Sequence, residues 1–243
     1  MRAIPLNELS IERKSILFLN GGGQIHITRH QKIARYFENT DYNLISIELP
    51  GHGKSSFDHI LTEDEFISHL KSEFTKLIKE YDIKIQLMIG FSLGGLVTLK
   101  MIEENLFPIP AAIVFGCGFD VDDTRAKTFE YYTSEQFFID QNWQPIMMKN
   151  HGDGWQNLLL SLKDFLYPGC PLFTQPSKLP PETFILLILG ENEELFDYTY
   201  NSKLSKDYNI DVKLLPSASH FEYTTTKNWD DFKAILDGYK HLF

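Results

Sequence analysis

The amino-acid sequence predicts an α/β protein with a mostly parallel central sheet, helices on both faces of the sheet and one helical insertion. Short apolar runs alternate with segments of helical periodicity, which is typical of parallel strands joined by helices. The apolar runs are nearly continuous, as expected for strands that are covered on both faces. The alternation stops between about residues 120 and 180, where aromatic residues and prolines take its place.

In chain order, the first strand is expected at residues 15–19 and leads into a glycine loop at 21–23. A helix is expected at 28–38, and a second strand at 43–49. The segment Thr-Glu-Asp-Glu then forms a capping box that starts a helix running from residue 62 to about 81.

In the second half of the chain, strands and helices alternate again on both sides of the insertion. We expect four further strands, at residues 86–91, 111–115, 184–189 and 211–215. Further helices are expected from residue 96, around 134–140 and 155–166, and at 197–207 and 228–243. The expected domain organisation is a core of residues 1–119 and 181–243, with a helical cap or lid formed by residues 120–180.

Composition excludes several classes of function. A formal net charge of -10 argues against a nucleic-acid or anionic-membrane partner. Cys117 and Cys170 are too few for a disulfide framework, and no ligand set for a metal is evident, so neither metal nor cofactor is expected. No apolar run approaches the roughly 20 residues that span a bilayer, and the first residues lack a signal segment. We expect a cytoplasmic protein that acts on a small-molecule substrate. The sequence does not indicate its oligomeric state.

The clearest motif is Gly90-Phe91-Ser92-Leu93-Gly94, which fits G-x-S-x-G. It lies between an expected strand and an expected helix, where this pattern places a serine on a sharp, strained turn with its hydroxyl exposed. The glycines allow strand and helix to approach each other closely. The amino-terminal end of the helix faces the serine and favours negative charge there. Ser92 is therefore the candidate nucleophile.

A serine hydroxyl needs a base within hydrogen-bond reach and a third group that orients the base. His220 follows the last expected strand, and the order serine, acid, histidine accompanies this turn on an open sheet. We therefore predict His220 as the base. His151, in the insertion, is a weaker candidate for a substrate contact. The histidines expected to be solvated are His26, His30, His59, His69 and His241.

The acid is expected after the preceding strand, where the acidic segment 190–194 lies. Glu193 is our choice, and Glu194 and Asp197 are alternatives. Asp120 is a further alternative, since it follows the strand after Ser92. The acidic segment could also be a solvated loop without a catalytic role.

Acyl transfer passes through an oxyanion, which needs preorganised N–H donors. One donor should be the amide of Leu93, directly after the nucleophile. The other should come from the glycine loop after the first strand, and Gly22 is the best candidate.

Together these segments resemble the α/β-hydrolase fold superfamily along nearly the whole chain. The resemblance includes the glycine loop, Leu-Pro-Gly-His-Gly-Lys-Ser at 49–55, the serine turn, the insertion, Gly-Glu-Asn-Glu at 190–193 and the late Ser-His-Phe. It implies a serine hydrolase with a helical cap between the sixth and seventh of the standard eight strands. The chain departs from the pattern in a missing or reduced leading hairpin, in Asn20 where a histidine is common, and in Glu193 where an aspartate is usual.

The expected activity is hydrolysis of an ester or thioester of a small to medium hydrophobic acyl group, through an acyl-enzyme on Ser92. The aromatic insertion should set specificity, and Phe138, Trp143 and Trp155 are the candidate substrate-binding residues. The same triad could instead serve carbon–carbon bond hydrolysis, acyl transfer or a lyase step. A non-catalytic ligand-binding protein is the remaining alternative, and it would not need serine, histidine and glycine loop together.

Overall fold

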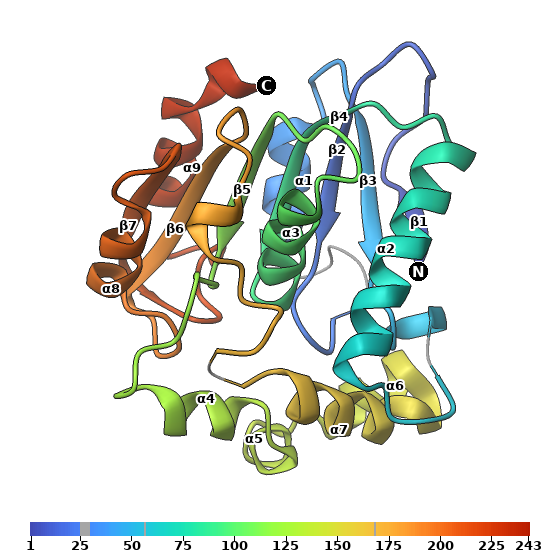
Figure 1. The fold of residues 1–243 in the computed structure, drawn as a ribbon, viewed down its shortest axis with the longest axis vertical. Helices are drawn as coiled ribbons and strands as arrows, with labels where there is room; N and C mark the ends of the chain where they lie inside the picture. The colour runs from blue at the N-terminus through green and yellow to red at the C-terminus, as the bar shows by residue number, and fades with distance from the viewer. Residues whose placement is uncertain (25–29, 56, 168) are drawn as a thin grey trace.

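The computed structural model describes residues 1–24, 30–55, 57–167 and 169–243. Its centre is a seven-stranded sheet with the order β1-β3-β2-β4-β5-β6-β7 (Figure 1). Every neighbouring pair is parallel except β1 and β3. The strands are β1 Arg2–Pro5, β2 Ser15–Leu19, β3 Asn43–Glu48, β4 Ile85–Phe91, β5 Ala111–Phe115, β6 Phe184–Asn192 and β7 Ile210–Ser219. The predicted fold class, a mostly parallel sheet with helices, is confirmed.

The edge strand β1 was not predicted. Its four residues pair antiparallel with β3, with Ala3 opposite Ile47, and none of them is fully buried. A strand that is so short and half exposed carries no apolar run for a sequence pattern to detect. In the described residues, β1 is the strand that precedes β2.

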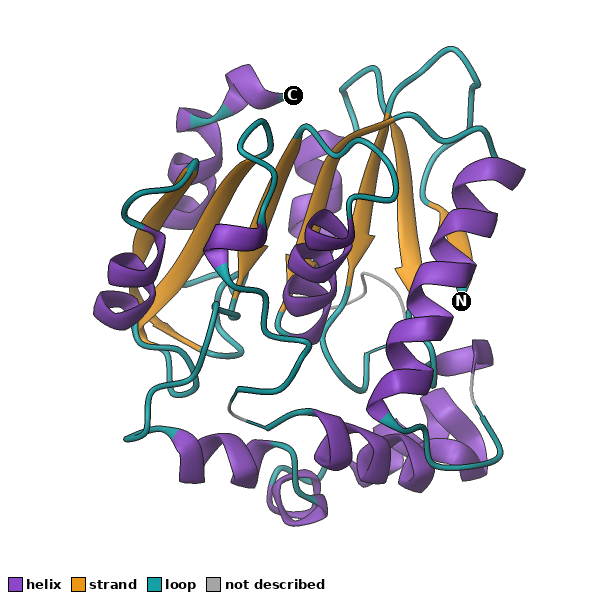
Figure 2. Ribbon diagram, in the orientation of Figure 1, coloured by secondary structure: helices purple, strands orange, loops and turns teal. Residues whose placement is uncertain are grey.

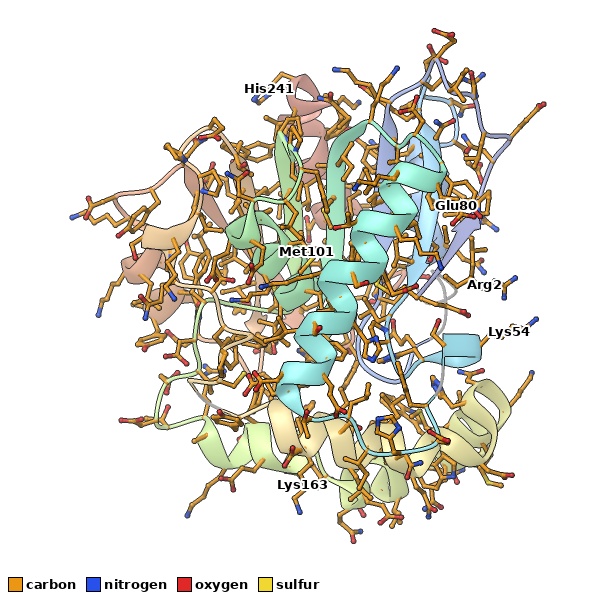
Figure 3. All side chains as sticks on the ribbon, turned by 45° about the vertical axis from the view of Figure 1, so that its right-hand side comes forward. Arg2, Lys54, Glu80, Met101, Lys163 and His241 are labelled. Carbon is orange, nitrogen blue, oxygen red and sulfur yellow. The ribbon has the colours of Figure 1, made fainter. Side chains whose placement is uncertain are left out.

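Helices cover both faces of the sheet (Figure 2). On one face lie α2 Glu63–Glu80, α3 Leu93–Glu104 and α8 Tyr198–Ser205, and on the other lie α1 Gln31–Phe37 and α9 Trp229–Gly238. Their apolar side chains form two separate clusters with the strands between them. The helix α3 is buried almost throughout, and Met101 on it is fully buried in the centre of the molecule (Figure 3).

Among the described residues, four short α-helices between β5 and β6 lie in a row beyond the carboxyl ends of the parallel strands (Figure 1). They are α4 Ala126–Tyr132, α5 Glu135–Asp140, α6 Gln144–His151 and α7 Trp155–Phe165. The sequence predicted α5 and α7 but missed α4 and α6. Pro145 lies in the first turn of α6, where proline is tolerated, although its presence in a sequence suggests a loop. Lys163 marks the outer, exposed side of α7 (Figure 3).

Within the described residues, no helix combines the length and the apolar character that crossing a membrane requires.

Candidate active site

Ser92 lies at the junction of β4 and α3 with φ of 50° and ψ of −121°, a region that residues other than glycine rarely adopt. Its amide donates a 3.0 Å hydrogen bond to the carbonyl of Phe115, which fixes the turn. A Cβ on Gly90 would lie 2.4 Å from the carbonyl oxygen of Gly94, and one on Gly94 would lie 2.3 Å from that of Leu19. The strained turn therefore requires both glycines.

The hydroxyl of Ser92 lies 3.1 Å from Nε2 of His220, and Nδ1 of His220 lies 2.8 Å from Oε1 of Glu193. A carboxylate accepts hydrogen bonds, so Nδ1 carries the proton and Nε2 is free to accept the serine proton. His220 follows β7 and Glu193 follows β6, so three strand ends bring these side chains to one edge of the sheet. Both His220 and Glu193 are buried.

The carboxylate of Glu193 has partners on both oxygens. Besides His220, Oε1 accepts a 3.0 Å bond from the amide of Leu195, and Oε2 accepts a 2.6 Å bond from the hydroxyl of Tyr223. Burial by itself would raise the pKa of Glu193, but the charge of His220 and these hydrogen bonds outweigh it and lower the pKa. The carboxylate therefore stays ionised and can stabilise an imidazolium.

Tyr223 is a component of the site that sequence reasoning missed. Its ring is fully buried, and its oxygen also accepts a 2.9 Å bond from the amide of Gly190. Burial, and secondly the neighbouring Glu193, raise its pKa well above the usual value, so it remains a neutral donor. Its position three residues after His220 is the only feature of the sequence that could have drawn attention to it.

The alternative acids have other roles. Glu194 accepts a 2.9 Å bond from the backbone amide of His220, not from its ring. Asp197 caps α8 and forms an ion pair with Arg125, which also donates to the carbonyl of Glu193. Asp120 accepts from backbone amides beside β5, including that of Gly169 at 3.2 Å.

The other histidines differ partly from expectation. His30 is buried against Phe91 and bonded to Thr224 at 3.0 Å, so the prediction of a solvated side chain was wrong for it. His30 is the N-cap residue of α1, whose buried Ile33 and Phe37 belong to the same apolar cluster as Phe91. His59 is half exposed, and His26 lies outside the described residues. His151 is buried and does not line the cavity over Ser92.

The glycine loop lies opposite the serine turn. A Cβ on Gly21 would lie 3.3 Å from Cβ of Ser92, and one on Gly22 would lie 3.9 Å from the side chain of Leu93. Leu93 is the first residue of α3, where backbone amides have no partner within the helix. Within the described part of the chain, the amide of Gly22 also has no acceptor. Both amides are therefore available to an oxyanion.

A cavity of about 410 Å³ opens over Ser92. Its wall is formed by aromatic side chains of the helical segment, among them Phe138 and Trp143, and by aliphatic side chains such as Leu162. Gln24, Thr133 and Asn150 supply polar groups. Among the described lining residues there is no aspartate, glutamate, lysine or arginine.

Trp155 does not line this cavity, contrary to the expectation for it. It is the first residue of α7, seven positions before Leu162, and seven residues of helix span about 10 Å. Trp155 therefore lies two turns away along the helix, where it is buried in the apolar core.

Solved structures with this fold are numerous, and they are distant in sequence. A putative non-heme bromoperoxidase, BpoC from Mycobacterium tuberculosis H37Rv, has a TM-score of 0.73 at 14% identity, covering 100% of this chain and 96% of that one. MenH from S. aureus has a TM-score of 0.69 at 20% identity, with coverage of 98% and 96%. A 2-hydroxy-6-oxo-6-phenylhexa-2,4-dienoate hydrolase from Rhodococcus sp. strain RHA1 has 0.73 at 13% identity, with coverage of 97% and 92%.

These identities are low, so the structures establish a common fold and no common substrate. A comparison with curated protein sequences finds no match. The model of the family described as serine aminopeptidase, S33, matches residues 11–150. Because this match covers more than half of the chain, and the fold agrees, the protein belongs to this family of α/β-hydrolases.

Proposed function

We propose that this hydrolase cleaves a carboxylic ester or thioester of a small to medium hydrophobic acyl group. The observation that carries the proposal is the hydrogen-bonded chain from Glu193 through His220 to Ser92. Ser92 lies at a cavity that has no charged side chains among its described lining residues. Activation of a serine by a histidine and an orienting carboxylate is the general route to acyl transfer.

In the proposed reaction, Nε2 of His220 takes the proton of Ser92 as Oγ attacks the carbonyl carbon. The amides of Gly22 and Leu93 stabilise the oxyanion, and Glu193 stabilises the imidazolium. His220 then gives the proton to the departing alkoxide or thiolate, which leaves an acyl-enzyme. In the second half, His220 takes a proton from water as the water oxygen attacks the acyl carbon, and returns it to Oγ of Ser92 as the bond between the acyl carbon and Oγ breaks and the acid leaves.

The neutral cavity supports an uncharged substrate. Recognition of a free amino terminus, which an aminopeptidase needs, would require a carboxylate, and recognition of a substrate carboxylate would require a cation. Among the described lining residues neither kind of side chain is present. A peptide with a free amino terminus, as the family description suggests, and a carboxylated substrate, like that of the Rhodococcus enzyme, are therefore poorer candidate substrates than a neutral ester.

In this proposal, residues 120–180 form a cap over the substrate, and Phe138 and Trp143 contact its apolar portion. Burial of roughly 0.8 kcal/mol per methylene would favour medium acyl chains over acetyl esters. Polar groups such as Asn150 would orient the ester group.

The test is intact-mass analysis after treatment with a fluorophosphonate, with Ser92→Ala as the control. We expect one adduct on the protein and none on the variant, followed by turnover of p-nitrophenyl butyrate and hexanoate well above that of an aminoacyl p-nitroanilide. No adduct on folded protein would refute an activated Ser92. Faster turnover of β-diketones, or ester transfer to added alcohols, would favour carbon–carbon hydrolysis or acyl transfer instead.

A further inference from the structure

The glycine loop forms a turn in which the carbonyl of Gly21 accepts a 3.1 Å bond from the amide of Gln24. Gly23, the third residue of the turn, has φ of +73°, the conformation for which a turn of this kind needs glycine. Three consecutive glycines leave such a loop many conformations. Something outside the turn must therefore select the one that presents the amide of Gly22 to Ser92.

His52 holds the amide side of Gly23. Its Nε2 accepts a 3.1 Å bond from the amide of Gly23, and its Nδ1 lies 2.9 Å from the carbonyl of Pro50. The ring is completely buried. Because its amide is occupied by His52, Gly23 is not available as an oxyanion donor, so the candidate Gly22 does not compete with it for that role.

His151 holds the carbonyl side of Gly23. Its Nε2 lies 3.0 Å from that carbonyl, and its Nδ1 accepts a 2.9 Å bond from the amide of Gly53. His151 is the last residue of α6, in the helical segment, and it is only 5% exposed. Both polar groups of Gly23 are thus bonded to imidazoles, one from the core and one from the helical segment.

The partners define the protonation states. A carbonyl accepts, so His52 carries its proton on Nδ1 and His151 carries its proton on Nε2. Each remaining nitrogen faces a backbone N–H, so either ring would lose one bond if it became a cation. The centroids of the two rings lie 5.7 Å apart. The charge of Glu48 acts to raise the pKa of His151, in opposition to burial. Burial, and secondly His151, lower the pKa of His52 to about 3, and burial lowers the pKa of His151.

We propose that His52 and His151 are positioning residues, which hold Gly23 so that the amide of Gly22 is preorganised for the oxyanion. The helical segment thereby contributes to catalysis through His151, in addition to covering the substrate. The inference rests on the proposed function, because it assigns a role within the same reaction. An oxyanion donor acts in the transition state, so its displacement lowers kcat and leaves KM largely unchanged.

Substitution of each histidine by Gln and by Asn separates the hydrogen bonds to Gly23 from those to Pro50 and Gly53. In His151→Gln the amide nitrogen can replace Nε2 and donate to Gly23, whereas in His151→Asn the amide oxygen can replace Nδ1 and accept from Gly53. In the same way His52→Gln retains an acceptor for Gly23, and His52→Asn retains a donor for Pro50. His59→Asn, at a half-exposed position, is the control.

With p-nitrophenyl butyrate, we expect the two Asn variants to lose about tenfold or more in kcat, with KM within about threefold, since one lost oxyanion donor costs 10²–10³. The Gln variants should retain most of kcat. Affinity for a trifluoromethyl ketone, which forms an oxyanion on Ser92, should fall in parallel with kcat/KM. Equal kcat in the Asn and Gln variants would overturn the proposal, while an inactive wild-type protein would instead refute the proposed function.

A second measurement does not depend on the variants folding. Nitrogen-15 spectra of the histidine rings should show His52 protonated on Nδ1 and His151 on Nε2, both neutral at pH 7. A cationic His151 at pH 7, or the same tautomer for both rings, would contradict the hydrogen-bond arrangement on which the proposal stands.

Discussion

The hydroxyl of Tyr223 lies 2.6 Å from Oε2 of Glu193, on the side of the carboxylate opposite His220. The phenolic oxygen of Tyr223 also accepts a hydrogen bond from the amide of Gly190, so the phenol is held both as a donor and as an acceptor. Glu193 is thereby fixed by contacts from two directions, which compensates for the extra rotatable bond of a glutamate.

Tyr223→Phe should leave one oxygen of a buried carboxylate without its donor. We expect a loss of about 1–3 kcal/mol in the free energy of unfolding and a lower kcat, because the unsatisfied carboxylate orients His220 less well. Urea unfolding and kinetics with p-nitrophenyl butyrate would measure both effects. An unchanged kcat together with reduced stability would show that Tyr223 has a structural role alone.

Substitutions of Glu193 should distinguish the effect of reach from that of charge. Glu193→Asp keeps the charge but shortens the side chain by one methylene, so it cannot keep its bonds to both His220 and Tyr223. Glu193→Gln keeps the length but can present a donor to His220 and favour the wrong tautomer, a change that costs about 10⁴ in kcat in serine proteases. We expect both variants to be slower in ester turnover, with Gln the slower. Equal rates for Glu193→Gln and the wild-type protein would refute Glu193 as the acid.

Trp143 and Trp155 form a matched pair for substrate selectivity. Trp143→Leu enlarges the cavity, so the ratio of kcat/KM for octanoate over butyrate esters should rise several-fold, given about 0.8 kcal/mol per buried methylene. Trp155→Leu should leave that ratio unchanged and lower the melting temperature, because Trp155 lies in the core. The opposite pattern would place the acyl group elsewhere.

Gly90 and Gly238 provide a test of the packing around the serine turn. A Cβ at Gly90 would collide with backbone, so Gly90→Ala should prevent folding or greatly reduce the yield of soluble protein. At Gly238 nothing lies within 4 Å of the added atom, and alanine there should be neutral or stabilise by about 0.4–1 kcal/mol. Expression yield and circular dichroism would compare the two, and a folded, active Gly90→Ala protein would contradict the close approach described above.

The buried His52 should make stability depend on pH. Its pKa is about 3 in the native state and 6.5 in the unfolded state, so between these values the unfolded state binds the extra proton. The free energy of unfolding therefore falls as the pH falls below 6.5, by about 2 kcal/mol from this group between pH 7 and 5. Urea unfolding at both pH values should show a smaller difference for His52→Gln. An identical difference in the two proteins would contradict the lowered pKa.

The sequence predicted what depends on local pattern. The strands before Ser92 and Glu193 are continuous apolar runs, and the glycines around Ser92 mark a sharp turn from strand to helix. The sheet and the fold class could be predicted from these patterns. His220 and Glu193 were predicted from their positions after strands, and the structure brings their side chains together with Ser92.

The remaining features depend on contacts between distant segments, which no local pattern records. Tyr223 meets Glu193 across 30 residues, and His151 meets Gly23 across 128. Trp155 and Trp143 look equivalent as aromatic residues of the insertion, and only the three-dimensional position of α7 separates them. Sequence pattern therefore predicted the core and its strand ends better than it predicted the walls of the cavity.

The hydrogen bond between Ser92 and His220 also joins residues that are 128 positions apart. During synthesis from the amino terminus, β4 and α3 leave the ribosome long before the strand that precedes His220. If the proposed function holds, a nascent chain stays inert towards esters until β7 has paired with β6. Turnover of a chromogenic ester would then report completion of the sheet, and could serve as a clock for co-translational folding.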